Sequence, residues 1–340
     1  MLRRSLLAAT VSLPLALANA QPAPDYDFQW STIGDTNNPA FDGGGYGFFA
    51  GRGVVNYEYR ISKLQITSGQ WLEFANTFSM REGGRLFTMP YQWGAYLDPH
   101  YNGPGERWVP KNLPNWDMLP VAGVSWREAA MYANWLHNDK SSEQWAIENG
   151  AYDTSTFSTD PNTLVFTDQL TRNPDAKFWI PSLDEWLKAA HYDPHRHGQG
   201  EGGWWLYPNS TDEPLTPGPP GIGQTTADWI DPDIQAGEWL IPLGAYPDEA
   251  SPWGLLDISG GASEWSEEHL EHRSRFFNGS NAGTTSLMRD HAGYPATSFP
   301  HTRWHHGLRI ASVVPAPSTS VLLVVTLTPV VLKRKRFHHD

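Results

Sequence analysis

Cysteine is absent from this 340-residue chain. The absence excludes disulfides, thiolate metal ligands and thiol nucleophiles. Charge is also sparse, because Asp, Glu, Lys and Arg make up only 18% of the residues, and the formal net charge is −13. Surfaces that bind nucleic acids need clustered Lys and Arg, so no nucleic-acid partner is expected. The sequence has no glycine-rich phosphate loop and no internal repeat.

Large aromatic and turn-forming residues are plentiful instead. The chain has 17 Trp, 31 Gly and 28 Pro, and 39% of its residues are hydrophobic. Gly and Pro favour turns, whereas indole rings bury much apolar surface. This composition predicts a loop-rich globular domain with an aromatic core and argues against a helical bundle.

The N-terminus has the pattern of a secretory signal peptide. Arg3 and Arg4 precede an apolar run at residues 6–17, and Ala18-Asn-Ala20 forms a cleavage site before Gln21. The run is too short for a membrane span, and Pro14 interrupts it. We therefore expect residues 1–20 to be a signal peptide, residues 21–44 a polar lead-in, and the protein to be exported.

Residues 313–340 have three parts. The segment Val314-Pro-Ala-Pro-Ser-Thr319 leads into an apolar run at 321–332, and the basic cluster Lys333-Arg-Lys-Arg336 follows. This arrangement resembles the PEP-CTERM sorting signal of exported bacterial proteins, with Ala316 where that signal has Glu. The resemblance implies transient membrane insertion of the tail and cleavage by a sorting machinery. The alternative is a permanent single-span anchor, with the basic cluster on the inner side.

Three segments combine helix-start signals with apolar spacing. Thr67 and Ser68 are N-cap candidates for a helix that runs to Phe78, and a strand is expected over 54–63, where aromatic and polar residues alternate. Ser125 with Glu128 and Ser182 with Glu185 form S-x-x-E capping boxes at two further helix starts.

Five sequence blocks, in order, match the pattern of a known family. Residues 251–265, S-P-W-G-L-L-D-I-S-G-G-A-S-E-W, resemble the signature S-P-x-G-x-x-D-M-x-G-N-V-W-E-W. Residues 59–76 resemble Y-x-I-x-K-x-E-V-T-x-x-Q-Y-x-x-F-x-N, and blocks at 120–138, 178–190 and 277–310 complete the set. The chain is thus similar to the formylglycine-generating enzyme family, also called the sulfatase-modifying factor family, over residues 45–312. The resemblance implies an α+β, irregular, loop-rich fold of the C-type-lectin-like kind.

The family's oxidase chemistry depends on two cysteines that bind copper between its Gly-Gly-Ser and Gly-Phe-Arg motifs. The corresponding stretch here, residues 281–293, contains Thr, Ser and Met288 but no thiol. A soft cuprous ion needs thiolate ligands. No catalytic residue is therefore carried over, no copper site is expected, and the formylglycine-generating activity is predicted to be lost.

The resemblance also implies calcium bound by oxygen atoms near the signature loop. The candidate positions combine two side-chain acids with backbone carbonyls, and they are Asp228, Trp229, Gly260, Ala262 and Glu264. Gly261 stands where the family has Asn, which removes one amide ligand. Calcium takes six to eight oxygen ligands. The alternative is a metal-free loop in which Glu264 accepts hydrogen bonds from backbone amides.

Other candidate groups are histidines and tryptophans. His301 and His305 have the i, i+4 spacing of a helical metal site, but no carboxylate lies between them. Indole rings next to polar loops suit a sugar or peptide ligand, although most Trp are expected in the core. The residues chosen as possible ligand contacts are Trp204, Trp205, Trp304 and Arg309.

The favoured function is that of an exported binding domain for an extracellular polymer, a peptide or a surface protein. The first alternative is an oxidoreductase that uses a metal centre of His and carboxylate ligands. The second alternative is a structural component of an exopolysaccharide matrix.

Overall fold

The computed structural model describes residues 23–82, 89–284 and 286–315. The signal peptide expected at 1–20 and all but the first three residues of the sorting tail expected at 313–340 lie outside these residues. Four α-helices of 4 to 12 residues are present in the described part; they are α1 (Ser68–Ser79), α2 (Trp126–His137), α3 (Trp145–Glu148) and α4 (Leu183–His191). In this part, no helix is long and apolar enough to cross a membrane.

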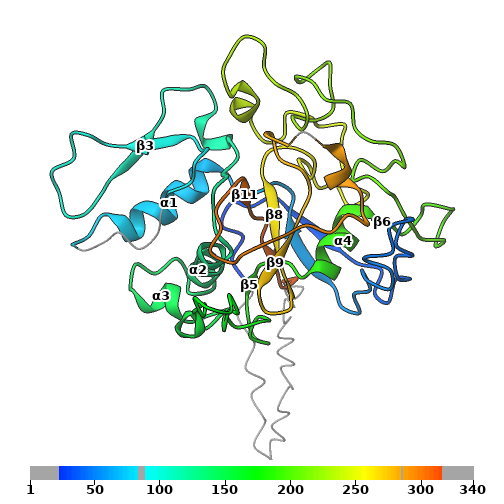
Figure 1. Cartoon of the computed structure of the whole chain (residues 1–340), viewed down its shortest axis with the longest axis horizontal. Coiled ribbons are helices and arrows are strands. Elements are labelled where there is room, and N and C mark those ends of the chain that lie inside the picture. The colour runs from blue at the N-terminus through cyan, green and yellow to red at the C-terminus, as the bar shows by residue number, and fades with distance from the viewer. Residues whose placement is uncertain (1–22, 83–88, 285, 316–340) are drawn as a thin grey trace, which may run out of the picture.

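The structure contains two four-stranded sheets. The first has the strand order β1 (Trp30–Ile33), β2 (Tyr59–Ser62), β12 (Ala311–Ser312), β5 (Phe178–Trp179), and all its pairs are antiparallel. The second has the order β10 (Thr297–Ser298), β9 (Ser274–Asn278), β8 (Ser263–Leu270), β11 (His306–Gly307), in which only the β8–β11 pair is parallel. Strands β5, β8, β9 and β11 of these sheets are labelled near the centre of Figure 1. The first sheet joins the two ends of the described chain, because β2 pairs with both β1 and β12.

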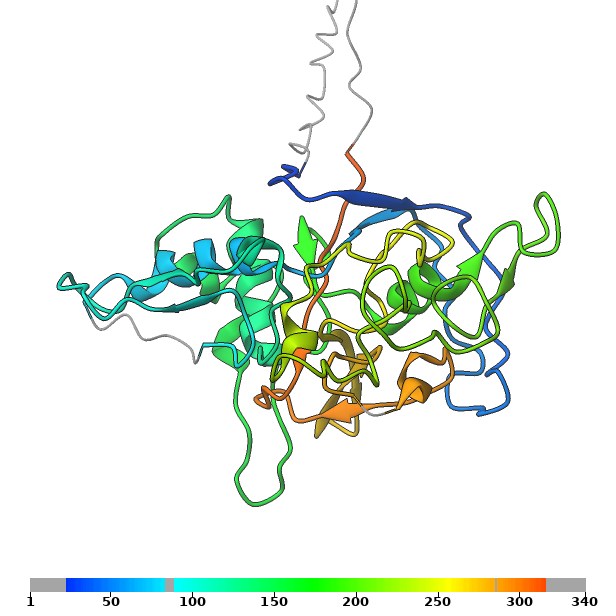
Figure 2. The same ribbon diagram turned by 90° about the horizontal axis from the view of Figure 1, so that it is seen from above.

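Short elements and ordered loops make up the rest. Two small hairpin sheets pair β3 (Ala95–Leu97) with β4 (Trp108–Pro110), and β6 (Tyr192–Asp193) with β7 (Gly203–Trp204). Single 3₁₀ turns are η1 (Trp116–Met118), η2 (Thr154–Thr156), η3 (Gly237–Leu240) and η4 (Leu287–Asp290). Figure 2 shows that long loops cover both sides of the central sheets. This mixed, loop-rich architecture with few helices is the one expected from the sequence.

Helices α1, α2 and α4 begin at the residues that the capping patterns predict. Reciprocal capping boxes join Ser125 with Glu128 and Ser182 with Glu185, and a third joins Thr67 with Gln70. The strand expected over 54–63 is shorter than predicted, since only Tyr59–Ser62 pairs in a sheet. Of the preceding residues 54–58 only Val55 is buried, and none of the five pairs in a sheet.

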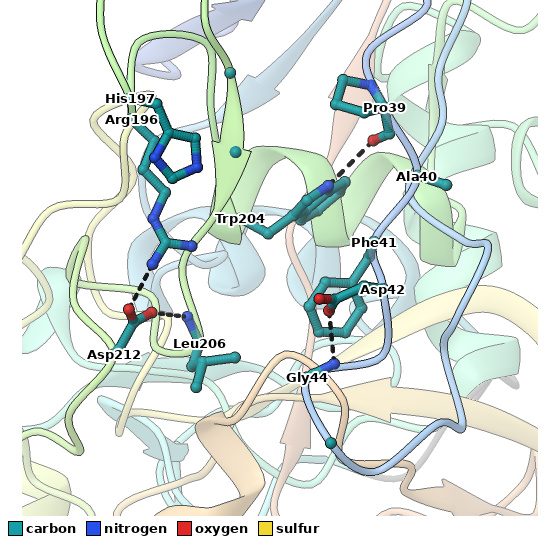
Figure 3. A pocket seen from close by; sticks show the side chains of 13 residues that line it. Pro39, Ala40, Phe41, Asp42, Gly44, Arg196, His197, Trp204, Leu206 and Asp212 are labelled. Atoms are coloured by element: carbon teal, nitrogen blue, oxygen red, sulfur yellow. Dashed lines mark hydrogen bonds and ion pairs between the residues drawn. The ribbon is translucent and has the colours of Figure 1, made fainter.

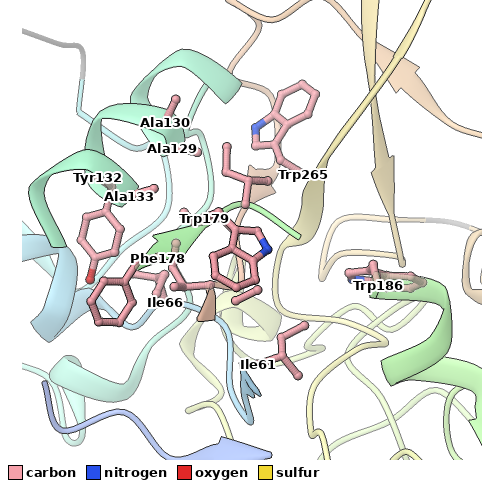
Figure 4. Packing of buried hydrophobic residues seen from close by; sticks show 14 of the residues in the cluster. Ile61, Ile66, Ala129, Ala130, Tyr132, Ala133, Phe178, Trp179, Trp186 and Trp265 are labelled. Atoms are coloured by element: carbon pink, nitrogen blue, oxygen red, sulfur yellow. The ribbon is translucent and has the colours of Figure 1, made fainter. Parts of the chain in front are cut away.

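Indole rings form much of the core. Trp71, Trp126 and Trp265 are completely buried, and Trp71 stacks on Tyr132 with ring centroids 5.5 Å apart. Figure 4 shows Trp179, Trp186 and Trp265 in one cluster with Ile61 and the alanines of α2. Small alanines on α2 let the helix approach these large rings closely, which is how such a helix-poor fold fills its interior.

Candidate functional site

The acid of the signature loop is paired with an arginine from the far end of the domain. Glu264 on β8 and Arg309 have no exposed side-chain surface, and Arg309 Nη2 donates to Glu264 Oε1 at 2.8 Å. Arg309 Nε lies 3.1 Å from Oε2, and Trp186 Nε1 donates to the same oxygen at 2.7 Å. The carboxylate therefore has a full positive charge and several donors around it, which is what a buried charge requires.

The carboxamide of Gln65 lies at the centre of the signature loop. Its nitrogen is 2.8 Å from the carbonyl oxygen of Asp257, 3.4 Å from that of Gly260, 2.6 Å from that of Ala262 and 3.1 Å from Glu264 Oε1. Gly260, Ala262 and Glu264 are the three candidate calcium positions of this loop, and their oxygens converge on a nitrogen atom of the protein. A cation and this amide cannot occupy the same place, so the residues as arranged do not fit calcium here.

The other two candidate calcium residues lie at the surface. Asp228 is exposed, has a φ of 54° and donates its backbone N–H to the carbonyl of Thr284, while Trp229 is half-buried. The structure thus places Asp228 and Trp229 on an outer turn and Glu264 in the interior. Across residues 23–82, 89–284 and 286–315, no three His, Asp or Glu side chains come close enough together to hold a metal ion.

The stretch where the family has its cysteines contains a buried carboxyl group. Asp290, in η4, accepts hydrogen bonds from Ser259 Oγ at 2.7 Å, from Ser280 Oγ at 2.9 Å and from the backbone N–H of Ser280 at 2.7 Å. Burial raises the pKa of Asp290 to about 6, although these hydrogen bonds oppose the rise. Met288 lies nearby with its sulfur 3.6 Å from the hydroxyl of Tyr46, which fits a packing role.

A cavity of about 360 Å³ opens next to this stretch. It is lined by backbone and side chains of two segments, with Phe277 at its floor: Asn281, Gly283, Thr284, Ser286, Arg289, Tyr294, Thr297, Ser298, Trp304, His305 and His306. Hydroxyl, amide, imidazole and guanidinium groups all reach it, and no carboxylate lines it.

The imidazole of His306 is fixed in the wall of this cavity. The side chain is 2% exposed, and its ring lies between those of Trp265 and Phe277, at centroid distances of 4.5 and 4.2 Å. Nδ1 is 3.1 Å from Ser263 Oγ, whereas Nε2 has no hydrogen-bond partner among the described residues. Burial lowers the pKa of His306 to about 3, so the ring is neutral at physiological pH. A buried polar atom without a partner is costly, and Nε2 is itself enclosed by protein, so the ring contributes to the cavity as a neutral wall.

Arg289 supplies the positive charge of the cavity. Its guanidinium lies 5.7 Å from the ring centroid of Phe277. Within the described residues, no carboxylate forms an ion pair with Arg289, although most other buried or half-buried arginines here have one, as Arg309 does. The cavity is therefore suited to a ligand that carries a negative group.

A second cavity, of about 530 Å³, lies on the other side of Trp304. The two cavities share Thr297, Ser298 and Trp304, and we call them together the Trp304 groove. The second cavity adds partly exposed apolar side chains, namely Leu164, Leu270 and Phe299. Trp304 itself is 73% exposed and stands between the polar and the apolar half. Strand β10 forms the edge of its sheet at this point.

A separate cavity of about 550 Å³ contains another of the expected ligand-contact residues (Figure 3). Trp204 lies at its floor, is only 8% exposed and donates Nε1 to the carbonyl of Pro39 at 3.1 Å. Arg196 pairs with Asp212 at 2.5 Å across the opening and covers the ring of Trp205 at 4.2 Å. Both indoles are thus already engaged by protein groups.

The four expected ligand-contact residues have surroundings that their positions in the sequence did not indicate. Trp304 lines the groove, Trp204 lines the separate cavity, Trp205 lies under the guanidinium of Arg196, and Arg309 is buried against Glu264. Gln65, Arg289 and His306 were not among the candidates. Gln65 stands at the Glu position of the first family block, and His306 directly precedes the Gly-Leu-Arg motif, so both could have been chosen from the motifs.

The two histidines with helical spacing do not form a metal site in the structure. His301 and His305 lie in a turn-rich segment between β10 and β11, outside any helix. His301 stacks on Phe299, and His305 packs against Trp239. The i, i+4 spacing therefore does not bring the two rings to one face.

Comparison with known proteins identifies the same family as the motifs. The family model described as "Sulfatase-modifying factor enzyme 1-like domain" matches residues 40–310. Three solved structures are similar over most of their lengths. "Treponema denticola variable protein 1" is 15% identical and covers 84% of this chain and 95% of its own, with a TM-score of 0.52.

The other two are more distant in shape. "Crystal Structure of CarF" is 17% identical and covers 85% of this chain and 99% of its own, with a TM-score of 0.47. PvdO from Pseudomonas aeruginosa is 13% identical and covers 84% and 92%, with a TM-score of 0.42. No curated protein sequence matches significantly. At these identities the likeness bears on the fold alone, and it confirms the fold expected for the family.

Proposed function

This chain belongs to the sulfatase-modifying factor family, and we propose that it is a cysteine-free binding domain of that family which holds an extended peptide in the Trp304 groove. The observation that carries the proposal is the 73%-exposed Trp304 beside a cavity in which the guanidinium of Arg289 has no carboxylate partner among the described residues. Oxidation by the family's copper chemistry needs thiolates, and the chain has no thiol to offer.

The two halves of the groove suit two different groups of one ligand. A carboxylate of the peptide would pair with Arg289 in the smaller cavity. An apolar side chain would rest against Leu270, Phe299 and Trp304 in the larger cavity. Edge strand β10 lies between the two, where an extended peptide can add backbone hydrogen bonds.

An exported location is part of the same proposal. The signal peptide at 1–20 and the sorting tail at 313–340 would place the domain at the cell envelope surface or outside the cell. The peptide would then come from a surface or extracellular protein. The sorting machinery remains the partner proposed for the tail.

Fewer observations support the two alternative functions. An oxidoreductase with a His and carboxylate centre would need a cluster of such side chains, and the described residues hold no group of three. A matrix component would bind an extracellular polymer, for which the half-buried Trp205 and the cavity of Trp204 are the remaining candidates. Both indoles already have protein partners, so the Trp304 groove is the better binding surface.

An array of immobilised peptides, each with one acidic and one apolar residue at varied spacing, tests the proposal. Selected peptides are then measured in solution with wild type and four variants. Trp304→Ala and Arg289→Gln are expected to weaken binding about tenfold or more, as loss of a central anchor does. The matched controls Trp145→Ala, on the 50%-exposed Trp145 of α3, and Arg107→Gln should bind as wild type does. Equal binding by Trp304→Ala and wild type would rule the groove out.

A further inference from the structure

We propose that the carboxamide of Gln65 replaces a metal cation in the signature loop, so that this domain holds its binding groove in shape without calcium. Four oxygen atoms lie within 2.6–3.4 Å of one nitrogen, Gln65 Nε2. Three are backbone carbonyls and one is a carboxylate oxygen. We call these four oxygen atoms the cradle. An –NH₂ group has only two hydrogens to donate, so the cradle holds more acceptors than an amide needs. Convergent carbonyl and carboxylate oxygens are the donor set that calcium takes.

The orientation of the amide follows from its other end. Gln65 Oε1 accepts the backbone N–H of Ala262 at 2.9 Å. If the amide were turned over, its nitrogen would face this N–H and its oxygen would face four other oxygens. Because the backbone N–H can only donate, it defines which end of the amide points into the cradle.

The charges near the cradle are also balanced without a metal. Glu264 is the one carboxylate in contact with the Gln65 nitrogen, and Arg309 already pairs with both of its oxygens. A divalent ion placed at the Gln65 nitrogen would lie next to this buried guanidinium and meet repulsion at low dielectric. Asp257 contributes only its backbone carbonyl to the cradle. Its side-chain Oδ2 accepts the N–H of Gly244 instead.

The loop is closed tightly over the amide. Gly261 has a φ of 59°, and a Cβ at this position would lie 2.6 Å from Gln65 Oε1. Gly260 has a φ of 83°, and a Cβ there would lie 2.4 Å from Thr226 Oγ1. Two glycines in left-handed conformations therefore let the chain turn tightly around the carboxamide, where any other residue would clash.

Gln65 also holds the strand that carries the groove. Its amide bonds to both the N–H and the carbonyl of Ala262, immediately before β8. The first residues of β8 pair in parallel with β11, where Ser263 is opposite His306 and Glu264 is opposite Gly307. Since His306 lines the groove, the amide fixes the backbone on which the cavity wall is built.

A single substitution tests whether the cradle can bind a cation once the amide is removed. Gln65 stands where the family block Y-x-I-x-K-x-E-V-T has Glu. In Gln65→Glu the new carboxylate would face Glu264 and three carbonyl oxygens, and it would have no hydrogen to donate to them. This arrangement is unstable unless a cation binds between the oxygens or one carboxyl takes up a proton, and added calcium competes with that proton. The variant should therefore acquire a dependence on calcium that the wild type does not have.

Thermal unfolding of the mature protein with added calcium and with a chelator tests the proposal. The wild type should melt at the same temperature in both. Gln65→Glu should melt lower in chelator and recover progressively as calcium rises, by the linkage of binding to stability. The control Gln169→Glu loses comparable bonds, to Thr171 O and Asn173 Oδ1, and should melt lower with no response to calcium.

Two outcomes would overturn the proposal. One is a melting temperature of Gln65→Glu that does not respond to calcium, because the oxygens would then not form a cation cradle. The other is calcium retained by the wild type on metal analysis and lost in Glu264→Gln, which needs no Gln65 variant to fold. Binding of a selected peptide should be equal in chelator and calcium for the wild type; this measurement rests on the proposed function, whereas the melting and metal measurements do not.

Discussion

Glu264 and Arg309, 45 positions apart in the chain, form an ion pair through both carboxylate oxygens that is completely enclosed by protein. The sequence offered two roles for Glu264, a cation ligand or an acceptor of backbone amides. The structure gives it side-chain donors instead, from Arg309, Trp186 and Gln65. Arg309 was a candidate ligand contact. Its guanidinium instead donates hydrogen bonds to Glu264 and to the carbonyls of Ser62, Lys63 and Leu256.

Replacing Glu264 by Gln should destabilise the protein strongly. The variant leaves the guanidinium of Arg309 buried without its counter-charge, which typically costs about 3–5 kcal/mol. The loss, measured by urea denaturation, should be the same in calcium and in chelator. Glu73→Gln, which breaks the exposed pair with Lys140, should cost less than about 1 kcal/mol. A Glu264→Gln variant as stable as the wild type would contradict this account of the pair.

The buried carboxyl of Asp290 should make stability depend on pH. Burial raises its pKa to about 6 from an ordinary value near 3.8, so the folded state holds this proton more tightly than the unfolded state. The contribution is therefore complete below about pH 4 and is lost as pH rises to about 6, by about 1.4 kcal/mol per pKa unit. Asp290→Asn should match the wild type near pH 4 and be more stable by up to about 3 kcal/mol near pH 7. Parallel pH profiles of the two proteins would refute the assignment.

Peptide binding in the Trp304 groove should not follow a histidine titration. Burial lowers the pKa of His306 to about 3, so Nε2 keeps one protonation state between about pH 5 and pH 7. The dissociation constant should be nearly flat over that range at constant ionic strength. His306→Phe keeps a ring between Trp265 and Phe277 but loses the contact of Nδ1 with Ser263 Oγ in the cavity wall, and it should bind more weakly. The exposed His301→Ala is the control, and a change in binding near about pH 6.5 in the wild type would show that a histidine of the cavity, His305 or His306, protonates.

The protein should not convert a sulfatase-type Cys-x-Pro-x-Arg peptide to formylglycine. No residue of the chain can supply a thiolate, and the segment 281–293 holds Asp290 in a serine network instead. The peptide is incubated with the protein, copper and oxygen, and its mass is measured. A mass loss accompanied by an aldehyde adduct would mean that another centre performs the oxidation.

Processing at both ends is expected in the native envelope. The mature protein should begin at Gln21 and end near Val314, because the two terminal patterns imply cleavage after export. Intact mass of protein purified from that envelope decides the question. Retention of Lys333 to Arg336 would indicate a permanent anchor in place of a sorted tail.

Local features followed from the sequence because their causes are local. A serine followed three residues later by a glutamate satisfies the first amides of a helix wherever it occurs, and both boxes at Ser125 and Ser182 begin helices. The ordered motif blocks identified the family, and with it the loop-rich fold. The aromatic core followed from composition, since so many indoles find room only in the interior.

The partner of each functional side chain depended on tertiary contacts between distant segments. Gln65 lies 199 residues before Glu264, and only the pairing of β8 with β11 and the fold of the loop bring both to Arg309. Spacing could not tell whether the loop oxygens surround a cation or an amide, because both bind the same carbonyls. The sequence also could not predict which side chains are exposed to solvent. Trp204 and Trp304 have similar polar neighbours in the sequence, but they are 8% and 73% exposed. Sequence thus determined which elements form, whereas long-range packing decided which charges are neutralised and which groups remain free to bind.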